Sequence, residues 1–202
     1  VPETIGSIFY INKNFNHLKK NVFCGYNLSC IGDEGKHSCL LSKYKNSPSD
    51  EAIIQAYKNL KIKKYKIYPF LKRGSDERQY NSPGVDLGIS SIFKSKYAEY
   101  KEYHTSKDDF KLVTLKGIKD GYKVALKSLQ ILQKNIYPKY KILCEPQLGK
   151  RGLFPTLSMK RNSENFLNYT NFLQYADGSI SLEKISKLIN LEYKLTKKIY
   201  LK

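Results

Sequence analysis

The sequence predicts an α/β domain with a mostly parallel sheet, followed by a small, mainly helical module. Before residue 135, short apolar runs typical of strands alternate with helical patterns, an order that favours a parallel sheet. A linker rich in Gly, Pro and Arg then interrupts this order, and only helical patterns follow it. The predicted boundaries are residues 1–145 for the α/β domain, 146–161 for the linker and 162–202 for the module, which we expect to be truncated.

Apolar periodicity and turn residues predict each element of the α/β domain. Residues 3–20 carry a helical stripe, and Ser47 is the N-cap of a helix that runs to about Leu60. Strands are predicted at 21–31, 38–43, 65–70 and 85–93, the first two as a hairpin-like pair around the turn at 32–35. Asp108 or Asp109 is the predicted cap of a long helix that ends near Gln133.

The C-terminal module contains three predicted helices, at 165–175, at 181–189 and from 192 onward. Asp177 and Gly178 form the turn after the first of them. The segment Ser181–Ile189 resembles the middle of a helix-turn-helix or winged-helix unit.

Composition bounds the class of protein. No apolar run approaches the roughly 20 residues of a membrane span. Val1-Pro2-Glu3 does not begin a secretory leader, and the four cysteines form no CxxC pair, so we expect free thiols and a cytoplasmic location. The chain starts without Met and ends on residues that still read as helix, so we expect a fragment cut at both ends.

The net charge of +18 raises the alternative of a nucleic-acid-binding or regulatory protein. Only four of the 36 basic residues are Arg, whereas base and phosphate recognition depends on arginine forks. The lysines also occur among many Asn, Ile and Tyr residues, as an A+T-rich genome produces, so solvated lysines are the favoured interpretation. The alternative would place Lys184, Lys187, Lys194, Lys197 and Lys198 on a phosphate-facing surface.

Two polar segments between apolar runs contain the candidate functional residues. Gly74–Asp86 includes Ser-Asp-Glu-Arg and then Pro-Gly, and Glu102–Asp109 reads Glu-Tyr-His-Thr-Ser-Lys-Asp-Asp. Together, the Ser-Asp turn and the Tyr-His-Thr-x-x-Asp element resemble the co-catalytic zinc exopeptidases, which have the aminopeptidase and glutaminyl-cyclase-like fold. The chain looks closer still to a bacterial aminopeptidase-like family of unassigned substrate with a winged-helix tail. In this resemblance, residues 1–135 match the later half of the peptidase domain and 160–202 match the tail.

His104 resembles the last zinc ligand of the exopeptidases, and Tyr103 beside it is assigned to substrate binding. A neutral imidazole binds zinc while its other nitrogen is oriented by an acceptor. Without this context, a lone histidine is more often an ordinary loop residue, and His17 and His37 are expected to face solvent.

Asp76 and Glu77 are the candidate catalytic acids. Ser75 and Asp76 match the family's Ser-Asp-His turn, which implies that Asp76 orients the groups around the metal. Glu77 departs from that pattern and is assigned to bind the free amino group of a peptide. Arg78 either neutralises these acids or anchors a carboxylate bidentately. The alternative for this pair is an ordinary polar turn.

Glu3, in Pro-Glu-Thr-Ile-Gly-Ser, resembles the element of these enzymes in which one Glu is the general base and the next a zinc ligand. Pro2 stands in place of the other Glu, so Glu3 is assigned as ligand or base, with a helix-capping acid as the equal alternative. Asn27–Gly32 resembles the strand that supplies another zinc carboxylate, but Ser29 replaces the Asp. The resemblance therefore favours one zinc ion rather than two.

The function implied by the resemblance is zinc-dependent hydrolysis of a peptide or amide bond. Zinc activates water and polarises the carbonyl, while a carboxylate accepts the proton. Catalytic zinc usually has three protein ligands, and this chain offers Glu3 and His104, so the further ligands are expected upstream of Val1. A catalytically inactive scaffold remains an alternative, supported by Ser29 and the missing Glu. Homo-oligomer formation is left open.

Overall fold

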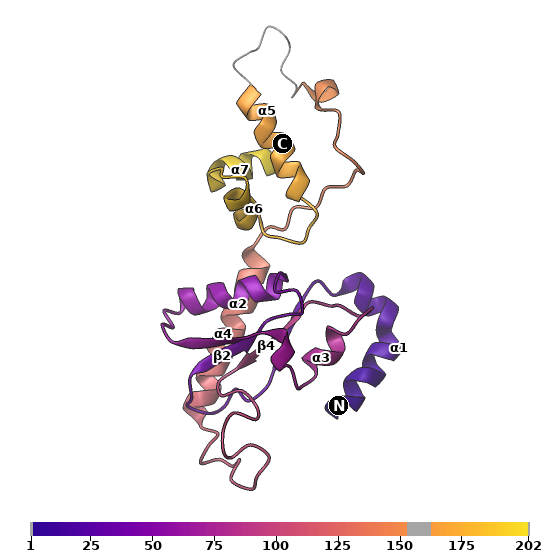
Figure 1. The fold of residues 1–202 in the computed structure, drawn as a ribbon. Coiled ribbons are helices and arrows are strands. Elements are labelled where there is room, and N and C mark those ends of the chain that lie inside the picture. The colour runs from indigo at the N-terminus through magenta and orange to yellow at the C-terminus, as the bar shows by residue number, and fades with distance from the viewer. Residues whose placement is uncertain (1, 153–162, 202) are drawn as a thin grey trace. The chain divides into compact units, whose positions relative to one another are not determined.

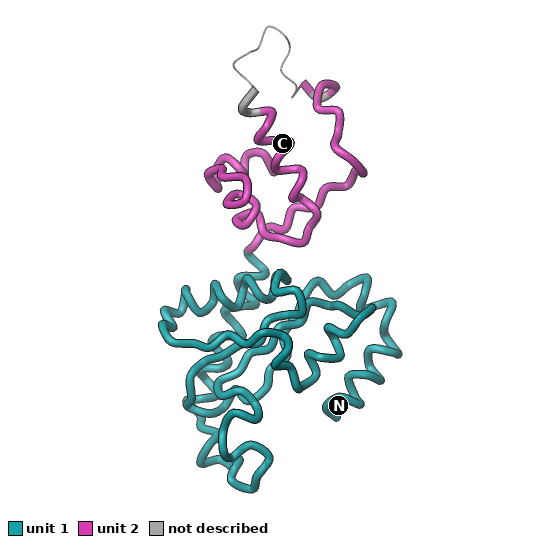
Figure 2. The backbone as a smooth tube through the Cα atoms, viewed as in Figure 1, with its two compact units in different colours: residues 1–134 teal, residues 135–202 magenta. Residues whose placement is uncertain are grey.

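The computed structural model describes residues 2–152 and 163–201, and the chain divides into two compact units, residues 1–134 and 135–202 (Figure 2). Residues 153–162, which make up most of the predicted linker, lie outside the described residues. Unit 1 contains the sheet and unit 2 contains the helical module.

Unit 1 is built on a mixed sheet with the strand order β1-β4-β2-β3. The strands are β1 (Gly25–Leu28), β2 (His37–Leu40), β3 (Tyr65–Tyr68) and β4 (Ile89–Phe93). β1 pairs parallel with β4, and β2 pairs parallel with β3, while β2 and β4 are antiparallel. The mostly parallel sheet is confirmed. The hairpin-like pairing of residues 21–31 with 38–43 is wrong, because β4 lies between these two strands.

Helices α2 (Pro48–Asn59) and α4 (Leu115–Lys134) cover one face of this sheet (Figure 1). Their core contains Cys39 and Ile92 from the sheet, Tyr57 from α2 and Val124 from α4. Because successive side chains of a strand point to opposite faces, the next residues of β2 and β4 belong to a second core. That core contains Leu40, Tyr68, Phe93 and Tyr97.

The start of α2 is fixed by a capping box, as the sequence predicts. Ser47 Oγ accepts the backbone N–H of Asp50 at 3.3 Å, and Asp50 Oδ2 accepts the backbone N–H of Ser47 at 3.0 Å. Asp50 also accepts hydrogen bonds from the hydroxyls of Ser42 and Ser90. The buried carboxylate of Asp50 therefore ties the helix to β4 and to the end of β2.

Helix α4 begins at Leu115, so the prediction that Asp108 or Asp109 caps it is wrong. Thr114 Oγ1 accepts the N–H of Gly117 at 3.0 Å, while Asp109 closes a turn by accepting the N–H of Lys111. Gly117 is required by close packing, because a Cβ there would lie 2.0 Å from the carbonyl oxygen of Gly32. The first turns of α4 thus rest on the backbone of the loop after β1.

Helices α1 (Ile5–Asn21) and α3 (Glu77–Tyr80) lie beside the sheet, with α3 between α1 and β4 (Figure 1). Ile11 and Leu18 of α1 are buried against Leu87 and Ile89 at the start of β4. The sequence predicts a polar turn where α3 stands. This single helical turn carries the candidate acids, so its position decides the geometry of the site.

Unit 2 contains α5 (Ser163–Tyr175), α6 (Leu182–Leu188) and α7 (Tyr193–Tyr200), so the three predicted helices are confirmed. Ser181 caps α6 by accepting the N–H of Lys184 at 3.2 Å. The core of the unit contains Phe172, Ala176, Leu182 and Ile185. Short 3-10 helices occur in both units, at η1 (Phe70–Lys72) and η2 (Leu148–Arg151).

Among the described residues, no helix combines the length and apolar character needed to cross a membrane. All four cysteines are free thiols, as the sequence predicts.

Candidate active site

Asp76 ties the segment before α1 to the start of α3. Its Oδ1 accepts hydrogen bonds from the backbone N–H of Thr4 and from Ser7 Oγ, both at 2.7 Å. Arg78 donates from Nη2 to Thr4 Oγ1 at 2.5 Å. We call these four residues the Asp76 clasp. It joins positions 69 to 74 residues apart in the chain, so the N-terminal segment is held by α3 rather than by its own sequence.

The clasp holds Thr4 in an unusual backbone conformation, with φ 64° and ψ −65°. A positive φ is sterically unfavourable for a β-branched residue and costs about 1–3 kcal/mol. Two hydrogen bonds to Thr4 offset that cost. Strain of this kind persists where the surrounding structure imposes it, and here it shapes the chain between Glu3 and the start of α1.

Glu77 is fully buried, and its carboxylate is surrounded by donors from this chain. Oε1 accepts from the backbone N–H groups of Gly74 and Ser75 at 2.9 and 3.1 Å and from Tyr97 Oη at 2.9 Å. Oε2 accepts from Asn27 Nδ2 at 2.9 Å. In this arrangement Glu77 fastens the Gly74–Ser75 turn to β1 and to Tyr97. Its assignment to the amino group of a substrate stays a prediction.

A buried cation lies against Tyr97, which donates a hydrogen bond to Glu77. Lys96 is 6% exposed, and its Nζ lies 3.9 Å from the centroid of the Tyr97 ring. Burial lowers the pKa of Lys96 below its ordinary value, whereas the charges of Glu99 and Glu77 act in the opposite direction. The pKa of Tyr97 is raised, first by burial and then by the charge of Glu77.

His104 and Tyr103 stack on each other in the loop between β4 and α4. Their ring centroids are 4.0 Å apart with an interplanar angle of 17°. Tyr103 is half-buried against the second core, whereas His104 is exposed and has a positive φ of 58°. Within the described part of the chain, the imidazole of His104 makes no hydrogen bond, so both of its nitrogens are available.

Glu3 is exposed and lies just before α1. The pKa of Tyr103 is raised by burial and, next, by the charge of Glu3. Glu3 directly precedes Thr4 of the Asp76 clasp, whereas His104 stacks on Tyr103.

The loop after β1 contains the turn that the sequence predicts at residues 32–35. Asp33 closes a turn, accepting from the N–H of Gly35 and from the N–H and Oγ of Ser95. Ser29 lies directly after β1 and contacts Cys30 Sγ at 3.5 Å. At this position the chain therefore offers a hydroxyl group in place of the carboxylate of the resembled strand.

The donor set of this chain does not by itself fit a catalytic zinc ion. Among the described residues, no three His, Cys, Asp or Glu side chains are grouped so that they could hold a metal. Glu3 and His104 are available, but Asp76 is committed to Thr4 and Ser7, and Glu77 to its four donors. A third ligand would have to come from outside the described residues.

Sequence reasoning missed the residues that hold the candidate acids. Thr4 and Ser7 donate hydrogen bonds to Asp76, and Asn27 and Tyr97 donate to Glu77. Asn27 is the first residue of the Asn27–Gly32 segment that resembles a strand of the zinc exopeptidases, and this resemblance could have pointed to it. Tyr97 had no local signal, because its partner lies 20 residues away.

A mixed α/β sheet domain followed by a small three-helix module is the class of protein that the fold defines. The chain matches the "Domain of unknown function (DUF4910)" family over residues 1–135 and the winged helix-turn-helix family over residues 135–201. The first match covers most of the chain, and the protein belongs to the DUF4910 family.

Two relatives are similar over nearly the whole chain. A Clostridium acetobutylicum protein named "Putative polysaccharide biosynthesis protein with aminopeptidase-like domain" is 32% identical over 199 residues, which are 97% of this chain and 45% of the relative. A crystal structure of a "putative peptidase" from the same organism has 31% sequence identity and a TM-score of 0.66, and the match covers 98% of this chain and 44% of that one. This chain thus spans less than half the length of both relatives and matches the C-terminal half of the first. A peptidase-like kind of protein is supported.

Proposed function

We propose that this chain is part of a zinc-dependent aminopeptidase-like hydrolase that acts on a peptide or amide bond. Glu3 and His104 are its ligands to one zinc ion, with Glu3 as the alternative general base. Asp76 and Arg78 position the segment that contains Glu3. Glu77 fastens the Gly74–Ser75 turn to β1, and Tyr103 contacts the substrate. The further zinc ligands are supplied by a segment upstream of Val1.

One observation carries this proposal: an exposed imidazole, His104, is held by stacking on Tyr103, while the Asp76 clasp fixes the residue next to Glu3. The clasp imposes a strained backbone on Thr4, and the charge of Glu3 acts on the Tyr103 hydroxyl. Among the described residues, the exposed imidazole of His104 has no hydrogen-bond partner, so both of its nitrogens are available to a metal. The peptidase-like names of the relatives support the class of reaction.

The test uses a polypeptide that contains residues 1–202 together with the additional region present in the relatives. We expect hydrolysis of aminoacyl-p-nitroanilides, and we expect His104→Ala and Glu3→Gln each to reduce kcat at least ~100-fold, the scale of losing a general base or a metal ligand. His17→Ala is the matched control, because His17 is exposed on α1. Unchanged kcat in both variants would remove Glu3 and His104 from the site.

A second candidate function is nucleic-acid binding by unit 2. Helix α7 anchors Thr196 in the interior and exposes Lys194, Lys197 and Lys198, and unit 2 matches a winged helix-turn-helix family. If these lysines bind phosphates, DNA affinity falls steeply with salt, and the slope of log K against log salt becomes shallower by about 0.9 per lysine replaced. A slope that is unaffected by Lys194→Gln and Lys197→Gln would exclude this candidate.

A further inference from the structure

A pocket of unit 1 lies between η1 and the segment after α3. Its volume is about 660 Å³, large enough for a small ligand or for one or two residues of a peptide. Four cationic side chains line it, Lys43, Lys45, Arg73 and Arg78, and none of the described residues that line it is acidic. Two of the chain's four arginines therefore lie at one pocket, although lysine dominates the rest of the sequence.

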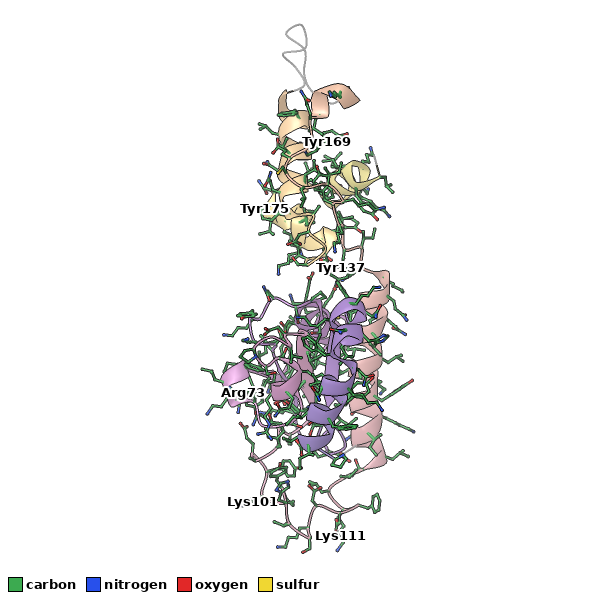
Figure 3. All side chains as sticks on the ribbon, turned by 90° about the vertical axis from the view of Figure 1, so that its right-hand side faces the viewer. Arg73, Lys101, Lys111, Tyr137, Tyr169 and Tyr175 are labelled. Atoms are coloured by element: carbon green, nitrogen blue, oxygen red, sulfur yellow. The ribbon has the colours of Figure 1, made fainter. Side chains whose placement is uncertain are left out.

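The four cations differ in how far they are committed to partners in the chain. Lys43 is paired with Asp86 at 2.7 Å, and Arg78 donates to Thr4 Oγ1. Arg73 stacks over the Phe70 ring, with its guanidinium carbon 5.0 Å from the centroid. Within the described part of the chain, Arg73 and Lys45 have no carboxylate partner, so the guanidinium fork of Arg73 is available to an anion. Figure 3 shows Arg73 at the surface of unit 1, beside η1.

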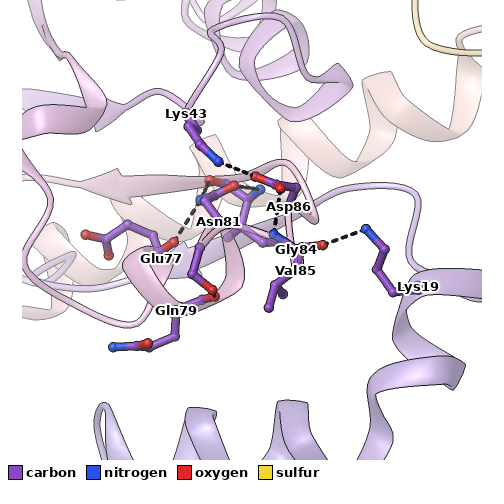
Figure 4. Close-up of polar contacts among 10 residues, drawn as sticks. Lys19, Lys43, Glu77, Gln79, Asn81, Gly84, Val85 and Asp86 are labelled. Carbon is purple, nitrogen blue, oxygen red and sulfur yellow. Dashed lines mark hydrogen bonds and ion pairs between the residues drawn. The ribbon is translucent and has the colours of Figure 1, made fainter.

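The wall of the pocket is held in place by buried polar contacts (Figure 4). Asn81 is 1% exposed, and its side chain donates to the carbonyls of Glu77 and Ile89 and accepts the N–H of Ile89. Lys19 donates to the carbonyl of Val85 at 2.9 Å. The loop that faces the arginines is therefore braced from β4 and from α1.

Apolar surface lies between the cations. Pro69, Phe70, Leu71 and Pro83 line the same pocket, and Leu71 is 83% exposed. A pocket that combines apolar walls with unpaired cations suits a ligand with an apolar body and an anionic oxygen group. Inorganic ions alone would use only part of it.

The pocket and the candidate active site share Arg78, and residues of both pack on the second core. Arg78 lines the pocket and also belongs to the Asp76 clasp. Phe70 lines the pocket and packs in the same core as Tyr103. The pocket therefore borders the clasp that positions the residue next to Glu3.

We infer that this pocket binds a carboxylate or phosphate group of the substrate and selects acidic substrates. Describing the ligand as a substrate rests on the proposed function, whereas the anion site itself does not. Arg73 supplies the bidentate contact, Lys45 adds charge, and the apolar walls hold the neighbouring part of the ligand.

The test is equilibrium binding to the 202-residue chain, which needs no hydrolysis. Glutarate and inorganic phosphate are titrated separately and followed by ¹⁵N NMR and calorimetry in about 50 mM salt, where exposed charges are only partly screened. We expect shifts confined to amides near Arg73, Lys45 and Ser82, and at least a 10-fold loss of affinity in the double variant Lys45→Gln and Arg73→Gln. Arg73→Lys, which keeps the charge but not the fork, should lose an intermediate amount.

Lys63→Gln with Lys64→Gln is the control, because it removes the same charge from exposed positions outside the pocket. Binding of glutarate alone would identify a carboxylate ligand, and binding of phosphate alone a phosphorylated one. Equal losses in the two double variants, or shifts spread over all lysines, would overturn the inference while leaving the proposed hydrolase untouched. Specific binding together with no hydrolysis by the longer protein would refute the hydrolase and leave the anion site standing.

Discussion

Glu77 provides the sharpest test of how unit 1 holds its candidate site. Its carboxylate is fully buried and accepts four hydrogen bonds, two from backbone N–H groups and one each from Tyr97 and Asn27. Glu77→Ala removes the acceptor and leaves these donors behind. Each buried donor left unpaired costs about 1–3 kcal/mol, and water reaches some of them through exposed Gly74. We therefore expect a loss of about 3–5 kcal/mol of unfolding free energy, a large part of the total for one domain.

Two milder variants separate the contributions. Tyr97→Phe removes one hydrogen bond to the carboxylate and should cost about 1.5–3 kcal/mol. Glu77→Gln keeps the shape, and its new NH₂ group can face Asn27 if that amide rotates to present its oxygen, so about 1–2 kcal/mol is expected.

The assay is urea-dependent hydrogen exchange of peptides from α3 and β4, which reports unit 1 separately from unit 2. The expected order of stability is wild type, Glu77→Gln, Tyr97→Phe, then Glu77→Ala. A loss below about 1 kcal/mol for Glu77→Ala would show that this carboxylate is not the anchor of the turn, and would restore it as a candidate for substrate binding.

Three further predictions concern pH, the clasp and helix packing. The pKa of His37 is lowered to about 4 from 6.5, mainly by burial and then by the charge of Lys94, so the unfolded chain takes up the proton first. Stability should fall by about 1–2 kcal/mol, after discounting for solvent screening, as pH drops through this window, and His37→Gln but not His17→Gln should remove that dependence in acid titrations of unfolding; equal slopes would contradict it. Asp76→Asn should speed hydrogen exchange in the first turn of α1 at least ~10-fold, because the hydrogen bonds to Thr4 and Ser7 weaken. Asp86→Asn, which weakens contacts to Lys43 and to the N–H of Gly84 but touches neither Thr4 nor Ser7, should leave that exchange unchanged, and equal effects would refute the clasp. Gly117→Ala should cost about 2–3 kcal/mol, because its Cβ meets backbone that cannot move aside, and a neutral result in urea unfolding would show that α4 is not seated on the loop after β1.

Local features of the fold were predictable because their causes are local. The capping box at Ser47 lies within four residues, and the helices of unit 2 follow from their own stripes and turns. The start of α4 was misplaced because Asp108 and Asp109 looked like caps, while Thr114 performs that role directly before the helix.

Strand order and side-chain environment depend on contacts between residues far apart in the chain, which local sequence patterns do not indicate. β4 inserts between β1 and β2 although it starts about 60 residues after the first and about 50 after the second, which no hairpin pattern indicates. His37 was expected to face solvent, but it is half-buried, with Nδ1 buried and Nε2 3.5 Å from the Nζ of Lys94. Its neighbours come from β4 and from α2, where Tyr57 packs near the ring.

In the candidate site, too, local features were predictable and long-range contacts were not. The residue types of the Ser-Asp-Glu-Arg and Tyr-His-Thr segments were visible in the sequence and pointed to the right family. The partners of Asp76 and Glu77 were not, since Thr4 and Asn27 lie 72 and 50 residues from them. The resemblance therefore identified the acids, and only the structure separated the acid that fixes the N-terminal segment from the one that is enclosed.

The most direct test of the central claim is the zinc content of the longer polypeptide, measured by plasma mass spectrometry beside the 202-residue chain and the His104→Ala variant of each. The account predicts about one zinc per longer chain, little in the 202-residue chain because a third ligand is missing there, and loss of zinc in the longer His104→Ala variant. Zinc that is retained when His104 is replaced, or a longer polypeptide that hydrolyses peptides without bound zinc, would contradict it.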